Sequence, residues 1–289
     1  LKAKNLTITN NSNIGSNNIG DKNAYAGVDV EVDNQLEILN GSEISSSTLS
    51  EGNAGYVKID AGEIKIDGIG TDDYQYTGVW SDSYPDSKGN AGTVEVSVNG
   101  LLEILNKGQI SSATYSQGNG NKVLIRTGEL KIQGQHGHFT GIWSDANPSS
   151  KGDAGTVEVK INSCAELLDG GQISSSTWSE GEAGTVSIFA DNLKIDAQGN
   201  EQHTTGIFSD TWTNTTGNAG RVNVTVEDIL ILNGGQISSI TRGNGNGGSI
   251  NVNAENISID AKENNEITTG ILSDAWLDSE GDAGKIEIV

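Results

Sequence analysis

The chain has 289 residues and a formal net charge of −22, although only 19% of its residues are charged. With 34% hydrophobic and 5% aromatic residues it could hardly fill the core of a spherical α/β enzyme, and it has no apolar run long enough to span a membrane. The negative charge without Lys/Arg clusters argues against nucleic-acid binding, and a single cysteine excludes an internal disulfide.

Three short phrases recur along the whole chain. ILNGSEISSS, from Ile38, returns in similar form at Ile104, Leu167 and Ile231, at spacings of 66, 63 and 64 residues. TGVWSD, TGIWSD, TGIFSD and TGILSD begin at Thr77, Thr140, Thr205 and Thr269. A third phrase, such as GNAGTV or GDAGTV, occurs twice per period, so each repeat of about 64 residues consists of two similar halves.

Each half contains three short strand-like segments separated by Gly and Asn turns. Apolar residues alternate within these segments, as in Leu102 and Ile104, so one face of each segment points to a common interior. Parallel stacking of such coils predicts an all-β fold: a right-handed, single-stranded parallel β-helix of about eight to nine three-stranded coils, continuous over residues 1–289. We expect the recurring glycines to supply positive φ at the turns, and the Asn or Asp of ILN, LLD and KID to occupy left-handed corners or a stacked amide column.

The phrases ILNGGQISSITRGNGNGGSI, GGQISSSTWSEGEAGTVSI and TGIWSDANPSSKGDAGTVEV together carry a family likeness that covers nearly the whole chain. It resembles the repeat region of filamentous haemagglutinin-like exoproteins, the surface adhesins that Gram-negative bacteria export by two-partner secretion. The resemblance implies a β-helix shaft, a secreted or cell-surface location, and a role in adhesion, aggregation or filament and matrix formation. The Asn-Pro motifs of the family's secretion domain have no counterpart, because Pro85 and Pro148 lie in other loop contexts.

Aromatic residues concentrate on one side of the third segment. If its first Ile or Val points inward, alternation sends positions one, three and five outward, and all five tryptophans fall at positions one and five. The predicted aromatic face comprises Trp80, Tyr84, Tyr115, Trp143, Trp178, Phe208, Trp212 and Trp276. Two interpretations stay open: a contact surface for glycans or proteins, or rings that stack on one another or lie under loops and stabilise the ladder.

Position three holds an aspartate in alternate coils: Asp82, Asp145, Asp210 and Asp274. Neighbours would lie on the order of 10 Å apart, too far to share a calcium ion, so we expect solvated, turn-stabilising side chains and no metal site. The three histidines, His136, His138 and His203, lie in variable excursions and are expected to be solvated. No coil stands apart with a unique acidic cluster, which disfavours an enzyme, and no cofactor is expected.

The longest variable stretches precede the TG phrases, for example IDGIGTDDYQYTG and IDAQGNEQHTTG. In a solenoid such excursions share one edge and often form its binding face. The chain is therefore predicted to be a non-catalytic adhesive shaft, with a polysaccharide-binding or polysaccharide-degrading β-helix as the alternative. Neither end carries a polar cap, so flanking repeats or other copies are expected to add end to end.

Overall fold

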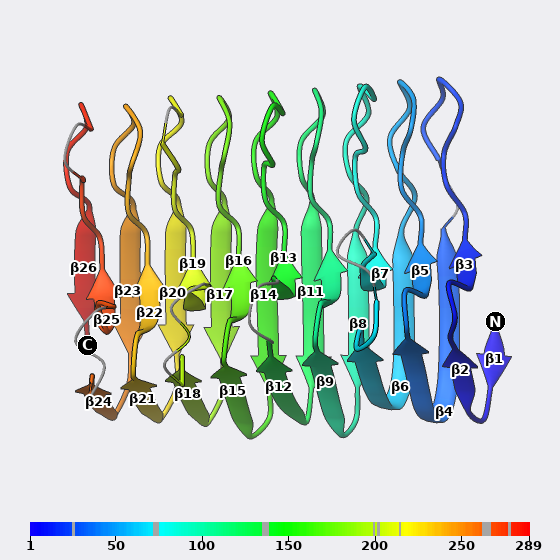
Figure 1. Ribbon diagram of the computed structural model, residues 1–289, viewed down its shortest axis with the longest axis horizontal. Coiled ribbons are helices and arrows are strands. Elements are labelled where there is room, and N and C mark those ends of the chain that lie inside the picture. The colour runs from blue at the N-terminus through cyan, green and yellow to red at the C-terminus, as the bar shows by residue number, and fades with distance from the viewer. Residues whose placement is uncertain are drawn as a thin grey trace.

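The computed structural model describes residues 1–24, 27–71, 75–134, 139–198, 200, 203–213, 215–261, 267–276 and 279–289. Within these residues the chain is all-β, with parallel strands that stack coil upon coil into a rod, the N- and C-termini lying at opposite ends (Figure 1). The predicted parallel β-helix is confirmed. No helix in the described part of the chain is long and apolar enough to cross a membrane.

Each coil contributes strands to three faces. The first face contains β1 (Lys2–Ala3), β4 (Val28–Leu39), β6 (Val57–Asp67), β8 (Val94–Val98), β11 (Lys122–Thr127), β14 (Thr156–Ile161), β17 (Thr185–Phe189), β20 (Arg221–Thr225), β23 (Ser249–Asn253) and β26 (Lys285–Ile288). The second contains β2 (Leu6–Ile8), the later parts of β4 and β6, β9 (Leu101–Leu105), β12 (Glu129–Gln133), β15 (Cys164–Leu168), β18 (Asn192–Asp196), β21 (Asp228–Leu232) and β24 (Asn256–Asp260). The third contains β3 (Asn13–Gly15), β5 (Glu43–Ser45), β7 (Thr77–Trp80), β10 (Gly108–Ser111), β13 (Thr140–Trp143), β16 (Gly171–Ser174), β19 (Thr205–Phe208), β22 (Gly235–Ser238) and β25 (Gly270–Leu272).

Hydrogen bonding joins the first two faces into one sheet of 17 described strands, while the third face is a separate sheet of nine described strands. The two faces merge because β4 and β6 run through the corner without a break, with a register shift between Val32 and Gln35 marking the bend. The cross-section thus has three strand segments, as the repeat predicts, but two sheets.

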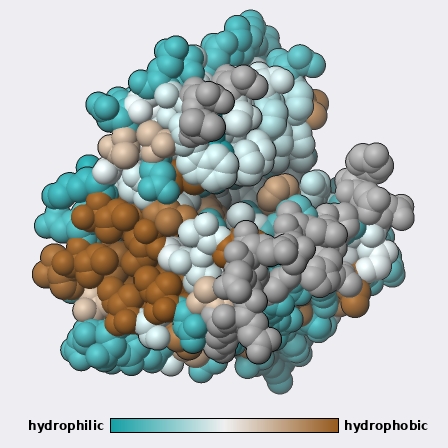
Figure 2. Space-filling view, turned by 60° about the vertical axis from the view of Figure 1, so that its left-hand side comes forward, coloured by the Kyte–Doolittle hydropathy of each residue, from teal (hydrophilic) through white to brown (hydrophobic). Residues whose placement is uncertain are grey.

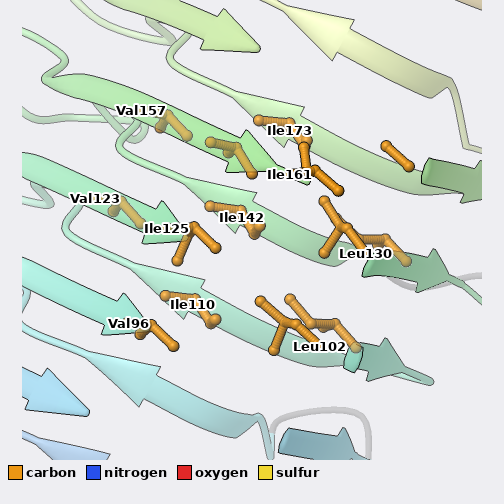
Figure 3. Packing of buried hydrophobic residues seen from close by; sticks show 14 of the residues in the cluster. Val96, Leu102, Ile110, Val123, Ile125, Leu130, Ile142, Val157, Ile161 and Ile173 are labelled. Carbon is orange, nitrogen blue, oxygen red and sulfur yellow. The ribbon is translucent and has the colours of Figure 1, made fainter. Parts of the chain in front are cut away.

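Inward-pointing Val, Leu and Ile form columns along the rod (Figure 3). Ile110, Ile142 and Ile173 are directly paired across successive coils of the third face, and each is 0% exposed. Like residues stack because the parallel register places equivalent positions one strand spacing apart. At the C-terminal end the inward columns reach the surface, where Ile286 and Ile288 are exposed. A space-filling view with this end turned forward shows an apolar patch on the surface (Figure 2).

Serines fill the corner of the interior beside the third face. The position after the first outward residue holds Ser81, Ser112, Ser144, Ser175, Ser209 and Ser239, all fully buried. Each hydroxyl donates to a backbone carbonyl of a Gly-rich turn, as from Ser112 Oγ to Gly92 O at 2.6 Å and from Ser175 Oγ to Gly155 O at 2.7 Å. A buried hydroxyl needs such a partner. The interior is therefore partly polar, which is why a chain with modest apolar content can fill it.

The glycines of the GNAG-type phrases have a different role from the one predicted. Positive φ occurs at the ILN-type corners, as at Asn233 (49°) and Gly234 (93°), but Gly89 and Gly184 do not lie in the left-handed region. Instead, a Cβ on Gly184 would lie 1.8 Å from Gly155 O and 2.2 Å from Ser175 Oγ. The prediction of positive φ is wrong for these turns, where most coils use glycine because adjacent coils approach closely; Asn121 takes the equivalent position in one coil.

A ladder of side-chain oxygens runs along the same turns. In eight successive coils one residue of this turn, which follows the first glycine in all coils but the one with Asn23, accepts a hydrogen bond, 2.8 to 3.0 Å long, from the backbone N–H of its counterpart in the next coil. The acceptors are Asn23, Asn53, Asn90, Asn119, Asp153, Glu182, Asn218 and Asn246. Asn, Asp and Glu can substitute for one another here because each supplies an oxygen.

Asn90→Ala is expected to lower the free energy of unfolding by about 0.5 to 1 kcal/mol. The exposed N–H of Asn119 loses its side-chain acceptor and hydrogen-bonds to water instead, so the loss is small. Asn90→Asp keeps the oxygen and should cost less. Chemical unfolding followed by circular dichroism measures both. Equal destabilisation by the two variants would show that the ladder oxygen is not what matters at this position.

Candidate functional site

The outward side of the third face alternates between two kinds of coil. One kind places a glycine before the inward residue and a ring after it, as in Gly141 and Trp143, and the next kind places Gln172 and Ser174 in the same positions. The backbone of Gly141 lies so close to the neighbouring coil that a Cβ would be 1.9 Å from Gln172 O. Each ring therefore has a small hydroxyl residue, not another ring, on the strands beside it.

The rings at position one are covered. Trp80, Trp143 and Phe208 are 5%, 8% and 6% exposed, so these three members of the predicted aromatic face do not form an open surface. They lie outside the aliphatic core of the coils, and Trp143 and Phe208 line a cleft on this side of the rod.

The residues at position five form a row of flat groups along the rod: Tyr84, Tyr115, Asn147, Trp178, Trp212, Arg242 and Trp276. The rings of Trp178 and Trp212 stack with centroids 3.8 Å apart and planes 12° apart, and those of Tyr84 and Tyr115 stack at 6.5 Å. Arg242 continues the row, since its Cζ lies 4.9 Å from the Trp212 centroid and 4.7 Å from that of Trp276. These contacts fit the interpretation in which rings stabilise the ladder.

Exposure differs along this row. Tyr84, Tyr115, Trp178 and Trp212 are half-buried, whereas Trp276 is 53% exposed. The half-buried rings keep accessible surface that borders clefts. Two residues of the row are not rings: Arg242, which stacks between Trp212 and Trp276, and Asn147, whose amide lies between the coils of Tyr115 and Trp178.

The aspartates at position three are not solvated, which corrects the sequence prediction for Asp82, Asp145 and Asp210. Asp82 and Asp210 are each 3% exposed and Asp145 is half-buried; only Asp274, in the last coil, is exposed. Each of the first three uses one carboxylate oxygen to accept a serine hydroxyl and a backbone N–H from the next coil. For Asp145 Oδ1 the donors are Ser174 Oγ and Ser176 N, both at 2.7 Å.

Burial raises the pKa of these carboxyl groups, because a charged carboxylate is poorly solvated there. The pKa of Asp82 rises to about 7 and that of Asp145 to about 6, with the hydrogen bonds of the neighbouring coil opposing the rise. Asp210 is shifted in the same direction, but the Arg242 guanidinium, 3.2 Å from Asp210 Oδ2, counteracts burial. The three carboxylates are thus held by one repeated arrangement, and only one has a cation against it among the described residues.

Two adjoining clefts lie along this side of the rod. The aromatic cleft, of about 310 Å³, is bordered by Tyr115, Asn147, Trp178 and Trp212 with Asp145 and Asp210 between them. The tyrosine cleft, of about 450 Å³, is bordered by Glu43, Trp80, Asp82, Tyr84 and Tyr115. Tyr76, Gln109 and Tyr115 line both clefts, so together they form a groove that crosses several coils.

The variable excursions border this groove, in agreement with the expectation that they share one edge of the rod; that this edge binds a ligand stays a prediction. Tyr76, Phe139, His203 and Thr204 come from three different excursions and line the aromatic cleft. Gln172 Nε2 donates to Thr204 O at 2.7 Å, which fixes the excursion against the third face. His203 packs on Phe139 with ring centroids 4.9 Å apart and is not a free loop residue; His136 and His138 lie outside the described residues.

Sequence reasoning placed the rings on the correct side but missed the polar members of the groove. Asn147 was visible only as an interruption of a repeat column, and the glutamines only as a regular part of the GQIS phrase. Among the described residues, no three His, Cys, Asp or Glu side chains are grouped so that they could hold a metal ion. Fold and groove together define a β-solenoid with a ligand-sized aromatic cleft on one face. Comparison with known families, curated proteins and solved structures gives no match.

Proposed function

We propose that this chain is part of an extracellular adhesive shaft, of the filamentous haemagglutinin-like type, that binds polysaccharide through the groove on its third face. The observation that carries the proposal is the aromatic cleft, where half-buried rings alternate with amide and carboxylate groups. Sugars have apolar ring faces that pack on aromatic side chains and hydroxyls that pair with such polar groups. A groove that runs across coils matches an extended chain better than a compact ligand.

A rigid rod supports an adhesive role because it holds repeated weak contacts at fixed spacing. If several sugar units bind along the groove at once, their contributions add through effective concentration. The acidic surface keeps such a rod soluble and discourages nucleic acid as a partner. Secretion, a Gram-negative cell surface and addition of further coils or copies at the ends belong to this proposal and stay predictions.

The competing hypothesis is a polysaccharide-degrading enzyme, and the raised pKa values of Asp82 and Asp145 are the observation in its favour. Against it, the same aspartate arrangement recurs at Asp210, and the repeated hydrogen bonds to the next coil account for all three carboxylates. A catalytic pair should be confined to one place. Release of reducing ends from any glycan that binds would favour the enzyme over the adhesive shaft.

Trp178→Ala and Trp212→Ala are each expected to weaken binding of a neutral polysaccharide roughly tenfold or more, because each removes a cleft wall. A glycan array followed by titration calorimetry measures the loss. Phe189→Ala is the matched control, since Phe189 is an exposed ring on β17, far from the groove residues in the coil, and should bind normally. Unchanged binding in both tryptophan variants would contradict the proposed function.

A further inference from the structure

We propose that the aromatic cleft holds a single ring of an uncharged sugar at Asn147, between the side chains of Tyr115 and Trp178. This inference rests on the proposed function and specifies its ligand class and its central subsite. It combines three observations: a gap in the row of rings, a buried amide nitrogen without a hydrogen-bond partner beside a carboxylate oxygen, and the sign of the charge around them.

Strand spacing predicts a gap of about the width of one ring. Residues at position five are one coil apart, so Tyr115 and Trp178 are separated by two strand spacings, roughly 9.6 Å, with only the Asn147 amide between them. A ring sandwiched between two others needs about 7 to 8 Å, twice an ordinary carbon contact. Where both positions carry rings, as at Trp178 and Trp212, the 3.8 Å centroid separation leaves no room for insertion.

A donor and an acceptor lie at the base of the gap. Asn147 Nδ2 is buried and has no hydrogen-bond partner among the residues that the structure describes. Two residues earlier, Asp145 uses Oδ1 for both of its hydrogen bonds to the next coil, and its Oδ2 accepts none from a described residue. Leaving a buried amide unpaired is costly, and sugar hydroxyls, which both donate and accept, can pair with the amide and the carboxylate together.

The charge of the cleft selects against acidic sugars. Asp145 and Asp210 both line it, and Arg242, the cation that borders it among the described residues, is already paired with Asp210 at 3.2 Å. The pKa of Asp145, about 6, leaves its carboxylate charged above neutral pH. A uronate or sulfate group inserted here would face like charge in a partly dehydrated site, whereas a neutral ring meets no repulsion.

The test is to fill the gap with the residue type that the neighbouring coils use. Asn147→Trp should retain the fold, because Trp178 and Trp212 occupy the same column, and should weaken binding roughly tenfold or more. Leu49→Trp introduces the same ring into the same column at an exposed position outside the aromatic cleft and should bind like the unaltered protein. Asn147→Ala, which cannot overpack, should weaken binding about fivefold through the lost hydrogen bond.

The probes are neutral oligosaccharides of glucose, xylose, mannose and galactose, three to six units long, with oligogalacturonate and a sulfated oligosaccharide as charged counterparts, all measured by calorimetry. Binding of a neutral probe that is lost in Asn147→Trp and kept in Leu49→Trp supports the inference. Tighter binding of a charged probe than of any neutral one overturns the inference. Normal binding by both Asn147 variants, with binding abolished in Trp178→Ala, also overturns it. In this second outcome the proposed function survives. If no probe binds the unaltered protein, both fail.

Discussion

Gly141→Ala is expected to lower the free energy of unfolding by about 4 kcal/mol or more, a large effect for a single methyl group. The new Cβ would lie 1.9 Å from the carbonyl oxygen of Gln172 in the adjacent coil, and backbone atoms on both sides are fixed by the ladder between β13 and β16. Relief would require the two coils to separate and lose hydrogen bonds. Guanidinium unfolding followed by circular dichroism measures the change.

Gly270→Ala is the matched control because the two glycines share the same TG phrase and the same φ of 155°. At Gly270 nothing lies within 4 Å of the added Cβ. Gly270→Ala therefore incurs only the backbone strain of a non-glycine residue at this φ, about 1 to 3 kcal/mol. If both variants lose the same stability, the contact with the next coil is not the reason for glycine, and the conformational explanation is sufficient.

The coil architecture could be predicted because it depends on local alternation repeated many times. Ile142 points inward and stacks on Ile110 and Ile173, as the aligned phrases indicate, and a single correct alignment sets the register of every coil. The function of the Gly-rich turns could not be predicted in the same way. Gly184 is required by the carbonyl of Gly155, a contact between coils that no pattern within one coil contains.

The candidate site followed from sequence only in outline. Alternation tells which side of a strand Trp80 and Asp82 lie on, but not what covers that side. The cover consists of neighbouring coils and of excursions with little sequence in common, such as those containing Tyr76 and His203. Burial of the aspartates, and with it their raised pKa values, therefore emerged only from the three-dimensional structure.

Asp82→Asn is expected to stabilise the protein at pH 8 by roughly 3 to 4 kcal/mol and to change its stability little at pH 4. Burial raises the pKa of Asp82 from 3.8 to about 7, with a smaller contribution in the same direction from the charge of Glu43. A group with a raised pKa in the folded state binds its proton more tightly there. Its stabilising contribution is complete below pH 4 and is lost as the pH rises through about 7.

The asparagine variant removes the buried charge and keeps the contacts, since its Oδ1 can still accept from Ser111 Oγ and from the N–H of Ala113. Asp153→Asn controls for general repulsion on a chain of charge −22, because Asp153 is an exposed ladder residue and the variant retains the oxygen that Glu182 N–H donates to. Unfolding curves at pH 4, 6 and 8 should show a stability difference that grows with pH for Asp82→Asn only. Parallel gains in the two variants would assign the pH dependence to overall charge, and burial of Asp82 would then have no special effect on stability.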